Sequence, residues 1–175
     1  MLNLHAYCDS DWANCPGTRR STSCFIAMLA GAAVSWVSKR QPTVALSTAE
    51  AECTTACLAA QEVQWIRQAL AEIGAPISKE PTTVHADSQS AIHMCNNPTA
   101  GRAKHIDIKM HFVKEAQERG VVNFIPTSQE AAAILTEAPN RPKIIKFRNT
   151  IHGDIEAATI SASIYINKAK YSCHL

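Results

Sequence analysis

The chain has 175 residues, of which 46% are hydrophobic and 18% are charged, and its formal net charge is +2. This length corresponds to about one domain with a sizeable core, while six glycines and eight prolines exclude a fibrous or low-complexity chain. The small net charge excludes the strong overall field of many nucleic-acid binders, so any such binding must rely on local clusters of basic residues.

The cysteines and the lack of a long apolar run indicate the setting of the protein. The seven cysteines include no Cys-x-x-Cys pair, and Cys53 and Cys57 are four residues apart on a predicted helix, too far along its axis for easy bridging. No signal peptide is visible, so we expect reduced thiols and a cytosolic or nuclear protein that is not secreted. No apolar run approaches the roughly 18 residues of a membrane span, so we expect no membrane partner. A core strand starts almost at Met1, which suggests a piece of a longer polypeptide.

The N-terminal part of the chain predicts three sequential strands. Residues 2–9 form an apolar, strand-like run, residues 14–18 are a turn cluster, and residues 23–30 are again apolar. Residues 33–38 alternate apolar and polar side chains, as a half-buried strand does. Gly31-Ala32 can close a hairpin between the second and third strands, so we expect the three strands to be antiparallel.

A long helix is predicted to follow. Ser47 and Glu50 have the spacing of a capping box, with Ser47 as the N-cap, and Gly74 provides the stop signal. Apolar side chains recur between them at helical spacing: Cys53, Ala56, Ala60, Val63, Ile66, Leu70 and Ile73. Glu50 therefore has a structural role at the helix start, whereas Glu52 in the same region is available for chemistry.

The second half of the chain predicts a strand that runs directly into Asp87. This strand covers residues 81–86, and ligands of open α/β sheets bind beyond such carboxyl ends of strands. The further predicted elements are a short helix at residues 88–95, a helix at 106–119, a strand at 121–125 and a short helix at 129–135. The tail, residues 154–175, fits a strand and a helix equally well.

Three carboxylates stand at the ends of separate predicted elements, namely Asp9, Glu52 and Asp87. Asp9 and Asp11 would share one face of a strand, where two like charges cost energy unless a cation or water compensates. The alternative is an ordinary polar strand end that enters a turn. If the fold brings the three acids together, they suit a hard divalent cation such as Mg²⁺, and two such ions can activate water for phosphodiester cleavage.

Longer motifs are ordered along the chain in a pattern that points to a known family. They are Asp9-Ser10-Asp11-Trp12-Ala13, Thr18-Arg19-Arg20-Ser21-Thr22-Ser23, Val34-Ser35-Trp36, Lys39-Arg40-Gln41-Pro42-Thr43-Val44, Ser47-Thr48-Ala49-Glu50-Ala51-Glu52 and Lys104-His105-Ile106-Asp107-Ile108. From residue 4 to residue 153, the sequence resembles the ribonuclease H domain of copia-type retrotransposon Pol polyproteins.

The resemblance implies a ribonuclease H-like α/β fold over residues 1–153, with a five-stranded mixed sheet flanked by helices. It also implies metal-dependent cleavage of the RNA strand of RNA–DNA hybrids during reverse transcription. The implied partners are the hybrid and the reverse transcriptase part of the same polyprotein, in the cytoplasm, in virus-like particles or in the nucleus.

Carried over residue by residue, the resemblance assigns Asp9, Glu52 and Asp87 as the catalytic carboxylates, which hold two Mg²⁺ or Mn²⁺ ions. The family's fourth carboxylate lies in the pattern Ala-Asp-Ile-Leu-Thr-Lys, where this chain has Ala133 in place of the aspartate and Glu137 in place of the lysine. Four carboxylates roughly balance the charge of two divalent ions, so with three we expect one ion to bind more weakly.

The departure at Ala133 leaves several functions open. Cleavage is expected to be reduced or lost unless Glu130 or Glu137 replaces the missing acid. The alternative is a decayed domain that binds RNA–DNA hybrids without cleaving them, and a third, weaker alternative is a purely structural part of the polyprotein.

Candidate contacts to nucleic acid are basic and hydroxyl-bearing residues near predicted strand and helix ends. They are Arg19, Arg20, Ser21, Thr22, Lys39, Arg40, Ser88, Gln89, Lys104 and His105. Such side chains bind phosphates and 2′-hydroxyl groups, and the alternative for these segments is an ordinary solvated surface.

Other polar and aromatic side chains have structural explanations. Asp11 is expected to stabilise the turn after the first strand or to support Asp9. A zinc site is disfavoured because the candidate ligands spread over more than one helix face; they are His105, Asp107 and His111. The tryptophans are expected in the core and not as stacking platforms; they are Trp12, Trp36 and Trp65.

Overall fold

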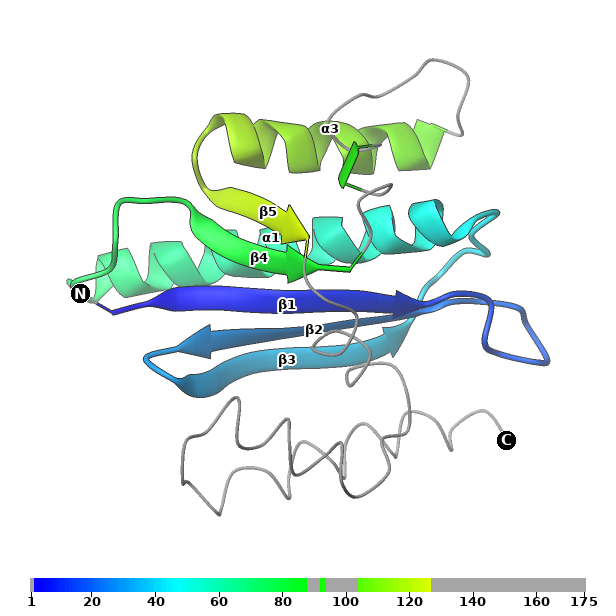
Figure 1. Cartoon of the computed structure of the whole chain (residues 1–175), viewed down its shortest axis with the longest axis horizontal. Helices are drawn as coiled ribbons and strands as arrows, with labels where there is room; N and C mark the ends of the chain where they lie inside the picture. Colours follow the sequence, from blue (N-terminus) through cyan, green and yellow to red (C-terminus); the bar gives the residue numbers. More distant parts are fainter. Residues whose placement is uncertain (1, 88–91, 94–103, 127–175) are drawn as a thin grey trace.

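The computed structural model describes residues 2–87, 92–93 and 104–126, with the side chain of His105 excepted. Its centre is a five-stranded sheet with the strand order β3-β2-β1-β4-β5 (Figure 1). The elements are β1 (Leu4–Asp11), β2 (Thr22–Leu29), β3 (Ala32–Arg40), α1 (Thr48–Glu72), β4 (Thr82–Ala86), α3 (Lys104–Glu118) and β5 (Val122–Pro126). The first three strands are antiparallel and the last two run parallel to β1, which confirms the predicted mixed sheet flanked by helices.

The hairpin between β2 and β3 turns one residue earlier than the sequence predicts. Ala30 and Gly31 occupy the two turn positions, with φ values of 51° and 85°. Such a two-residue turn needs positive φ at both positions, which glycine adopts freely and alanine only at a cost. The predicted turn at Gly31-Ala32 is wrong by one residue because Ala32 pairs with Leu29 as the first residue of β3.

Helix α1 begins and ends where the capping signals predict. The Ser47 hydroxyl accepts a hydrogen bond from the Glu50 amide at 3.2 Å, and the Glu50 carboxylate accepts one from the Leu46 amide at 2.9 Å. At the other end, Gly74 has a φ of 70° and its amide donates to the carbonyl of Ala71. These contacts pair backbone groups that find no partner inside the helix, and they leave Glu52 without a capping task.

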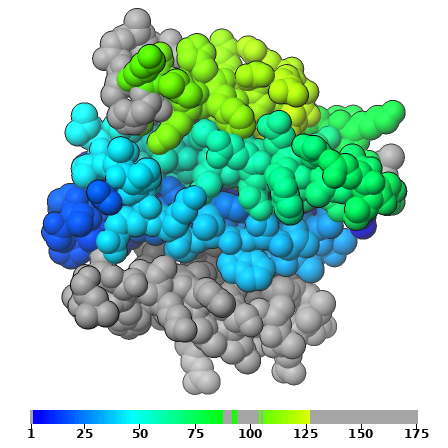
Figure 2. Space-filling model, turned by 180° about the vertical axis from the view of Figure 1, so that it is seen from behind, coloured from blue at the N-terminus to red at the C-terminus, as the bar shows by residue number. Residues whose placement is uncertain are grey.

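The main core lies between one face of the sheet and the two helices. Helices α1 and α3 lie side by side over this face (Figure 2). Every second residue of the strands faces the helices. The residues of β1 and β4 in this core are Leu4, Ala6, Cys8, Val84 and Ala86. Helix α3 contributes the side that was predicted to be apolar, formed by Ile106, Met110, Val113 and Ala116. Since β1, β4 and β5 are parallel, their carboxyl ends meet at one edge of the sheet.

The three tryptophans are not core residues, so this prediction is wrong. Trp12, Trp36 and Trp65 are 45%, 44% and 64% exposed. Trp12 donates its indole N–H to the carbonyl of Ala45 at 3.1 Å, which satisfies the polar group and leaves the ring at the surface. The buried side of α1 consists mainly of alanine and cysteine side chains, together with Val63 and Ile66.

Several predictions lie outside the described residues. They are Ser88, Gln89, the helix at residues 129–135 with Glu130 and Ala133, Glu137, and the tail at residues 154–175. Of the predicted helix at residues 88–95, Ile92 and His93 are described and are helical. Within the described ranges, no helix is both long and apolar enough to cross a membrane. No disulfide joins the five cysteines of these ranges to one another, and all five are buried.

Candidate active site

Asp9 and Asp87 are brought together by the pairing of two parallel strands. Cys8 of β1 lies opposite Ala86 of β4, so the next residues, Asp9 and Asp87, stand at the same edge of the sheet. Asp9 is buried, and its carboxylate accepts a hydrogen bond from the amide of Ser10 at 2.8 Å. The parallel register therefore places two carboxylates side by side.

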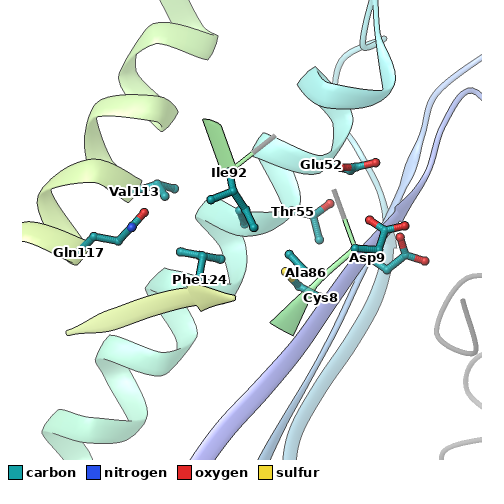
Figure 3. A pocket seen from close by; sticks show the side chains of 11 residues that line it. Cys8, Asp9, Glu52, Thr55, Ala86, Ile92, Val113, Gln117 and Phe124 are labelled. Atoms are coloured by element: carbon teal, nitrogen blue, oxygen red, sulfur yellow. The ribbon is translucent and has the colours of Figure 1, made fainter. Parts of the chain in front are cut away.

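Glu52 reaches the same place from the beginning of α1. It lines one cleft together with Asp9 and Asp87, and this cleft has an empty volume of about 340 Å³. Figure 3 shows the carboxylates of Asp9 and Glu52 at one end of the cleft. The opposite end is formed by Ile92, Val113, Gln117 and Phe124. The structure thus brings the three sequence-predicted carboxylates into one cleft, although they come from three separate elements.

Three of the described residues that line the cleft are acids, and none of them is a lysine, an arginine or a histidine. Burial raises the pKa of the Cys8 thiol far above its usual range, and the nearby charges of Asp9, Asp87 and Glu52 raise it further. Burial also raises the pKa of the Asp87 carboxyl, against the opposite effect of a backbone hydrogen bond at that residue. Both shifts reflect a site where added negative charge is unfavourable unless a cation lies nearby.

The donor set fits a divalent metal ion that binds oxygen ligands. Mg²⁺ is usually held by one or two carboxylates, with waters and substrate phosphates completing its coordination. In the part of the chain that the structure describes, no three His, Cys, Asp or Glu side chains stand close enough together to hold a metal ion as a group. Asp9, Glu52 and Asp87 line one cleft without forming such a group, so a metal ion bound there would need further ligands from water or nucleic acid.

Sequence reasoning missed a buried polar cluster behind these carboxylates, formed by Ser23, Gln41 and Thr55. The side-chain amide of Gln41 donates to the Ser23 hydroxyl at 2.9 Å and to the Ala51 carbonyl at 2.8 Å. In the sequence, Gln41 follows two basic residues and precedes Pro42, which is typical of an exposed loop. No local pattern separates a buried loop glutamine from an exposed one, so nothing in the sequence marked Gln41 as buried.

Basic side chains gather beside the same end of the sheet. The pairing of β2 with β3 places Arg40 opposite Thr22, and Thr22 follows the loop that carries Arg19 and Arg20. Together with Lys39, these arginines form a group of four exposed cations, here named the basic edge. Figure 2 shows the loop after β1, in blue, beside the cyan segment that precedes α1.

The other predicted contact residues differ in their exposure. Ser21 is fully buried and its hydroxyl accepts a hydrogen bond from the Ala13 amide at 3.1 Å, so it supports the loop and does not present its hydroxyl at the surface. Lys104 is exposed at the first position of α3. Asp11 accepts a hydrogen bond from the side chain of Asn14, as expected for a residue that stabilises the turn. The side chains of Ser88, Gln89 and His105 lie outside the described part.

Known proteins share long stretches of sequence with this chain. It is 33% identical over 153 residues to the Retrovirus-related Pol polyprotein from transposon RE1 of Arabidopsis thaliana, a match that covers 86% of the chain and 10% of that protein. It is 36% identical over 143 residues to the Pol polyprotein from transposon TNT 1-94 of Nicotiana tabacum, covering 80% of the chain and 11% of that protein. This chain is a homologue of one segment of the retrovirus-related Pol polyproteins. It spans about a tenth of the length of these relatives, and no family model matches it.

Solved structures identify the fold of this Pol homologue. LC11-RNase H1, isolated from compost, matches it with a TM-score of 0.56 and 14% identity, over 77% of this chain and 91% of that one. The same enzyme in complex with an RNA/DNA hybrid matches with a TM-score of 0.53 and 13% identity, over 76% of this chain and 91% of that one. At these identities the likeness concerns the fold alone, and it confirms the ribonuclease H fold that the sequence motifs imply.

Proposed function

We propose that this Pol homologue is the ribonuclease H domain of a copia-type retrotransposon polyprotein and cleaves the RNA strand of RNA–DNA hybrids with divalent metal ions. The supporting observation is that Asp9, Glu52 and Asp87, carried by three different elements, line one cleft. The Cys8 thiol in this cleft does not offer a competing nucleophile, because its raised pKa keeps it protonated.

In the proposed reaction, the carboxylates of the chain hold the metal ions and thereby orient the scissile phosphate. Asp9 and Asp87 act from the sheet, and Glu52 acts from the helix that lies against it. Two bound Mg²⁺ or Mn²⁺ ions would supply an activated water and would stabilise the charge on the leaving oxygen. Asp9 is buried and accepts the Ser10 amide hydrogen, so its carboxylate is oriented before any ligand binds.

The basic edge supports binding of the nucleic-acid backbone beside this cleft. Its four cations are exposed and suit phosphate oxygens, which receive half or more of the hydrogen bonds in protein–DNA complexes. Lys104 at the start of α3 extends the proposed surface, and the resemblance adds Ser88, Gln89 and His105 to it. The exposed ring of Trp12 offers an apolar face at the same end of the sheet. A protein of the same fold, LC11-RNase H1, has been solved with an RNA/DNA hybrid.

A second candidate function is binding of the hybrid without cleavage. The observation that favours it is Ala133, which stands where the family pattern has an aspartate. With three carboxylates for two divalent ions, the cleft has less negative charge to hold the second ion. Glu130 and Glu137 are the acids that would compensate under the first candidate function.

The proposed domain covers residues 1–153, with residues 154–175 as a separate tail. Because the Pol relatives are about ten times longer than the matched segment, the reverse transcriptase of the same polyprotein is the proposed partner of this domain. The cytoplasm, virus-like particles within it, or the nucleus are the proposed sites of action.

The two candidate functions are separated by one experiment. An RNA–DNA hybrid with a labelled RNA strand is incubated with the protein and Mg²⁺ or Mn²⁺, and both binding and cleavage are followed. The first candidate predicts metal-dependent cleavage of the RNA strand that Asp9→Asn abolishes. Equal cleavage by wild type and Asp9→Asn would refute the assigned site, and binding without cleavage in either metal would establish the second candidate.

A further inference from the structure

A buried glutamine connects the elements that carry Asp9 and Glu52. Gln41 is 3% exposed and lies in the segment between β3 and α1. Its side-chain nitrogen donates to the Ser23 hydroxyl at 2.9 Å and to the Ala51 carbonyl at 2.8 Å. A carboxamide nitrogen carries two hydrogens, so both bonds form at once and join β2 to the first turn of α1.

Thr55 completes this cluster from the next turn of the helix. Its hydroxyl oxygen lies 2.7 Å from the Ser23 hydroxyl and 3.1 Å from the Ala51 carbonyl. All members of the cluster are at most 3% exposed. One set of hydroxyl orientations gives every donor an acceptor, with Ser23 donating to Thr55 and Thr55 donating to Ala51. Fully satisfied buried polar networks of this kind hold their elements in one arrangement.

The cluster is close to Asp9 through strand pairing and to Glu52 through the helix backbone. Ser23 is the strand partner of Ser10, which directly follows Asp9. Ala51 directly precedes Glu52 in the helix. Any shift between the strands and the first turn of α1 would therefore change the separation of the two carboxylates.

The backbone of Gln41 is also hydrogen-bonded, and its side-chain cluster reaches the lining of the cleft. Its backbone amide donates to the Ser21 carbonyl at 2.8 Å, so both ends of the residue are fixed. Thr55, which shares its hydrogen-bond partners, lines the cleft together with the carboxylates. The contacts thus extend from the loop to the cleft without a break.

We propose that Gln41 is a positioning residue that aligns Glu52 with Asp9 for metal binding. This inference rests on the proposed metal site. Without the carboxamide, the Ser23 hydroxyl and the Ala51 carbonyl lose a buried donor, and the first turn of α1 is free to move to recover the hydrogen bonds. Residues that support metal ligands in this way typically change metal affinity or activity by roughly 10- to 100-fold.

The test is a calorimetric titration of the whole chain with Mn²⁺, for wild type, Gln41→Leu and Gln61→Leu. Gln61 is exposed on the same helix and provides the matched control. We expect Gln41→Leu to weaken Mn²⁺ binding by about tenfold or more and Gln61→Leu to change it by less than about twofold. In Mg²⁺-dependent cleavage, Gln41→Leu lowers kcat and leaves the KM for the hybrid unchanged, because the phosphate contacts of the basic edge remain.

A second pair of variants covers the case in which Gln41→Leu does not fold. Thr55→Val removes only the hydroxyl at nearly constant volume and is expected to weaken Mn²⁺ binding. Thr55→Ser keeps the hydroxyl and is expected to bind Mn²⁺ with wild-type affinity. Wild-type Mn²⁺ affinity in both Gln41→Leu and Thr55→Val, with only the melting temperature lowered, would show that the cluster is purely structural. Lack of Mn²⁺ binding by the wild type would instead overturn the proposed metal site, and this inference with it.

Discussion

The basic edge makes a quantitative prediction about the salt dependence of hybrid binding. If Arg19, Arg20, Lys39 and Arg40 each neutralise one phosphate, the logarithm of the binding constant should fall with the logarithm of salt concentration with a slope of about −3.6. Between about 50 and 200 mM salt, this slope corresponds to a loss of affinity of about 150-fold. The double substitution Arg19→Ala and Arg20→Ala should reduce the slope to about −1.8 and the loss to about 12-fold.

Fluorescence anisotropy of a labelled hybrid in EDTA measures these slopes without cleavage. The matched control is Lys114→Ala with Arg119→Ala, which removes the same charge from the last turns of α3 and the residue that follows it. Both residues form exposed ion pairs, Lys114 with Glu118 at 3.8 Å and Arg119 with Glu115 at 3.4 Å. They lie near the C-terminal end of α3, which leads into the start of β5. The carboxylates stand at the opposite end of the sheet, where the parallel strands finish. Equal slopes for wild type and the Arg19/Arg20 variant, or equal reductions in both variants, would refute the assigned contact surface.

Three further predictions concern packing, pH and the missing acid. Met110→Ala removes a fully buried side chain of α3 and should lower the free energy of unfolding in urea by about 2–5 kcal/mol, whereas the exposed neighbour substitution His111→Ala should change it by less than about 0.5 kcal/mol. Burial lowers the pKa of His5, and the nearby His85 lowers it further, so the unfolded chain binds more protons than the folded chain. The contribution of His5 to the free energy of unfolding should therefore be complete above about pH 6.5 and should fall as the pH is lowered below it. His5→Gln should reduce this decline, and an identical decline in both proteins between about pH 7.5 and 5.5 would contradict the assignment. Ala133→Asp should raise the rate of Mg²⁺-dependent cleavage by restoring the fourth carboxylate, and an unchanged rate would show that this position does not limit metal occupancy.

The strands and helices of this protein are encoded by short-range signals. The capping box at Ser47 and Glu50 and the stop at Gly74 predict the ends of α1 because backbone hydrogen bonds at helix ends involve residues only three or four positions apart. The apolar side of α3 follows in the same way from the period of the helix. Of these local features, the turn between β2 and β3 was misplaced by one residue, since Ala30 adopts a positive φ that its side chain does not favour.

Sequence motifs also identified Asp9, Glu52 and Asp87 as candidates, but only the tertiary structure places them in one cleft. Their proximity depends on the register that sets Cys8 opposite Ala86, and on the packing of α1 against the sheet. Such contacts join residues far apart in the chain, so no local pattern specifies them.

The same reason explains what sequence reasoning misjudged. A tryptophan is apolar enough for the core, yet Trp65 is exposed because it lies on the side of α1 that faces away from the sheet, whereas Val63 and Ile66 face the core. A loop glutamine is polar enough for the surface, yet Gln41 is buried because Ser23 and the first turn of α1 close around it. Local patterns in the chain thus specify the elements and the chemical groups at their ends. Burial follows only from the folded arrangement, because it depends on which surfaces meet.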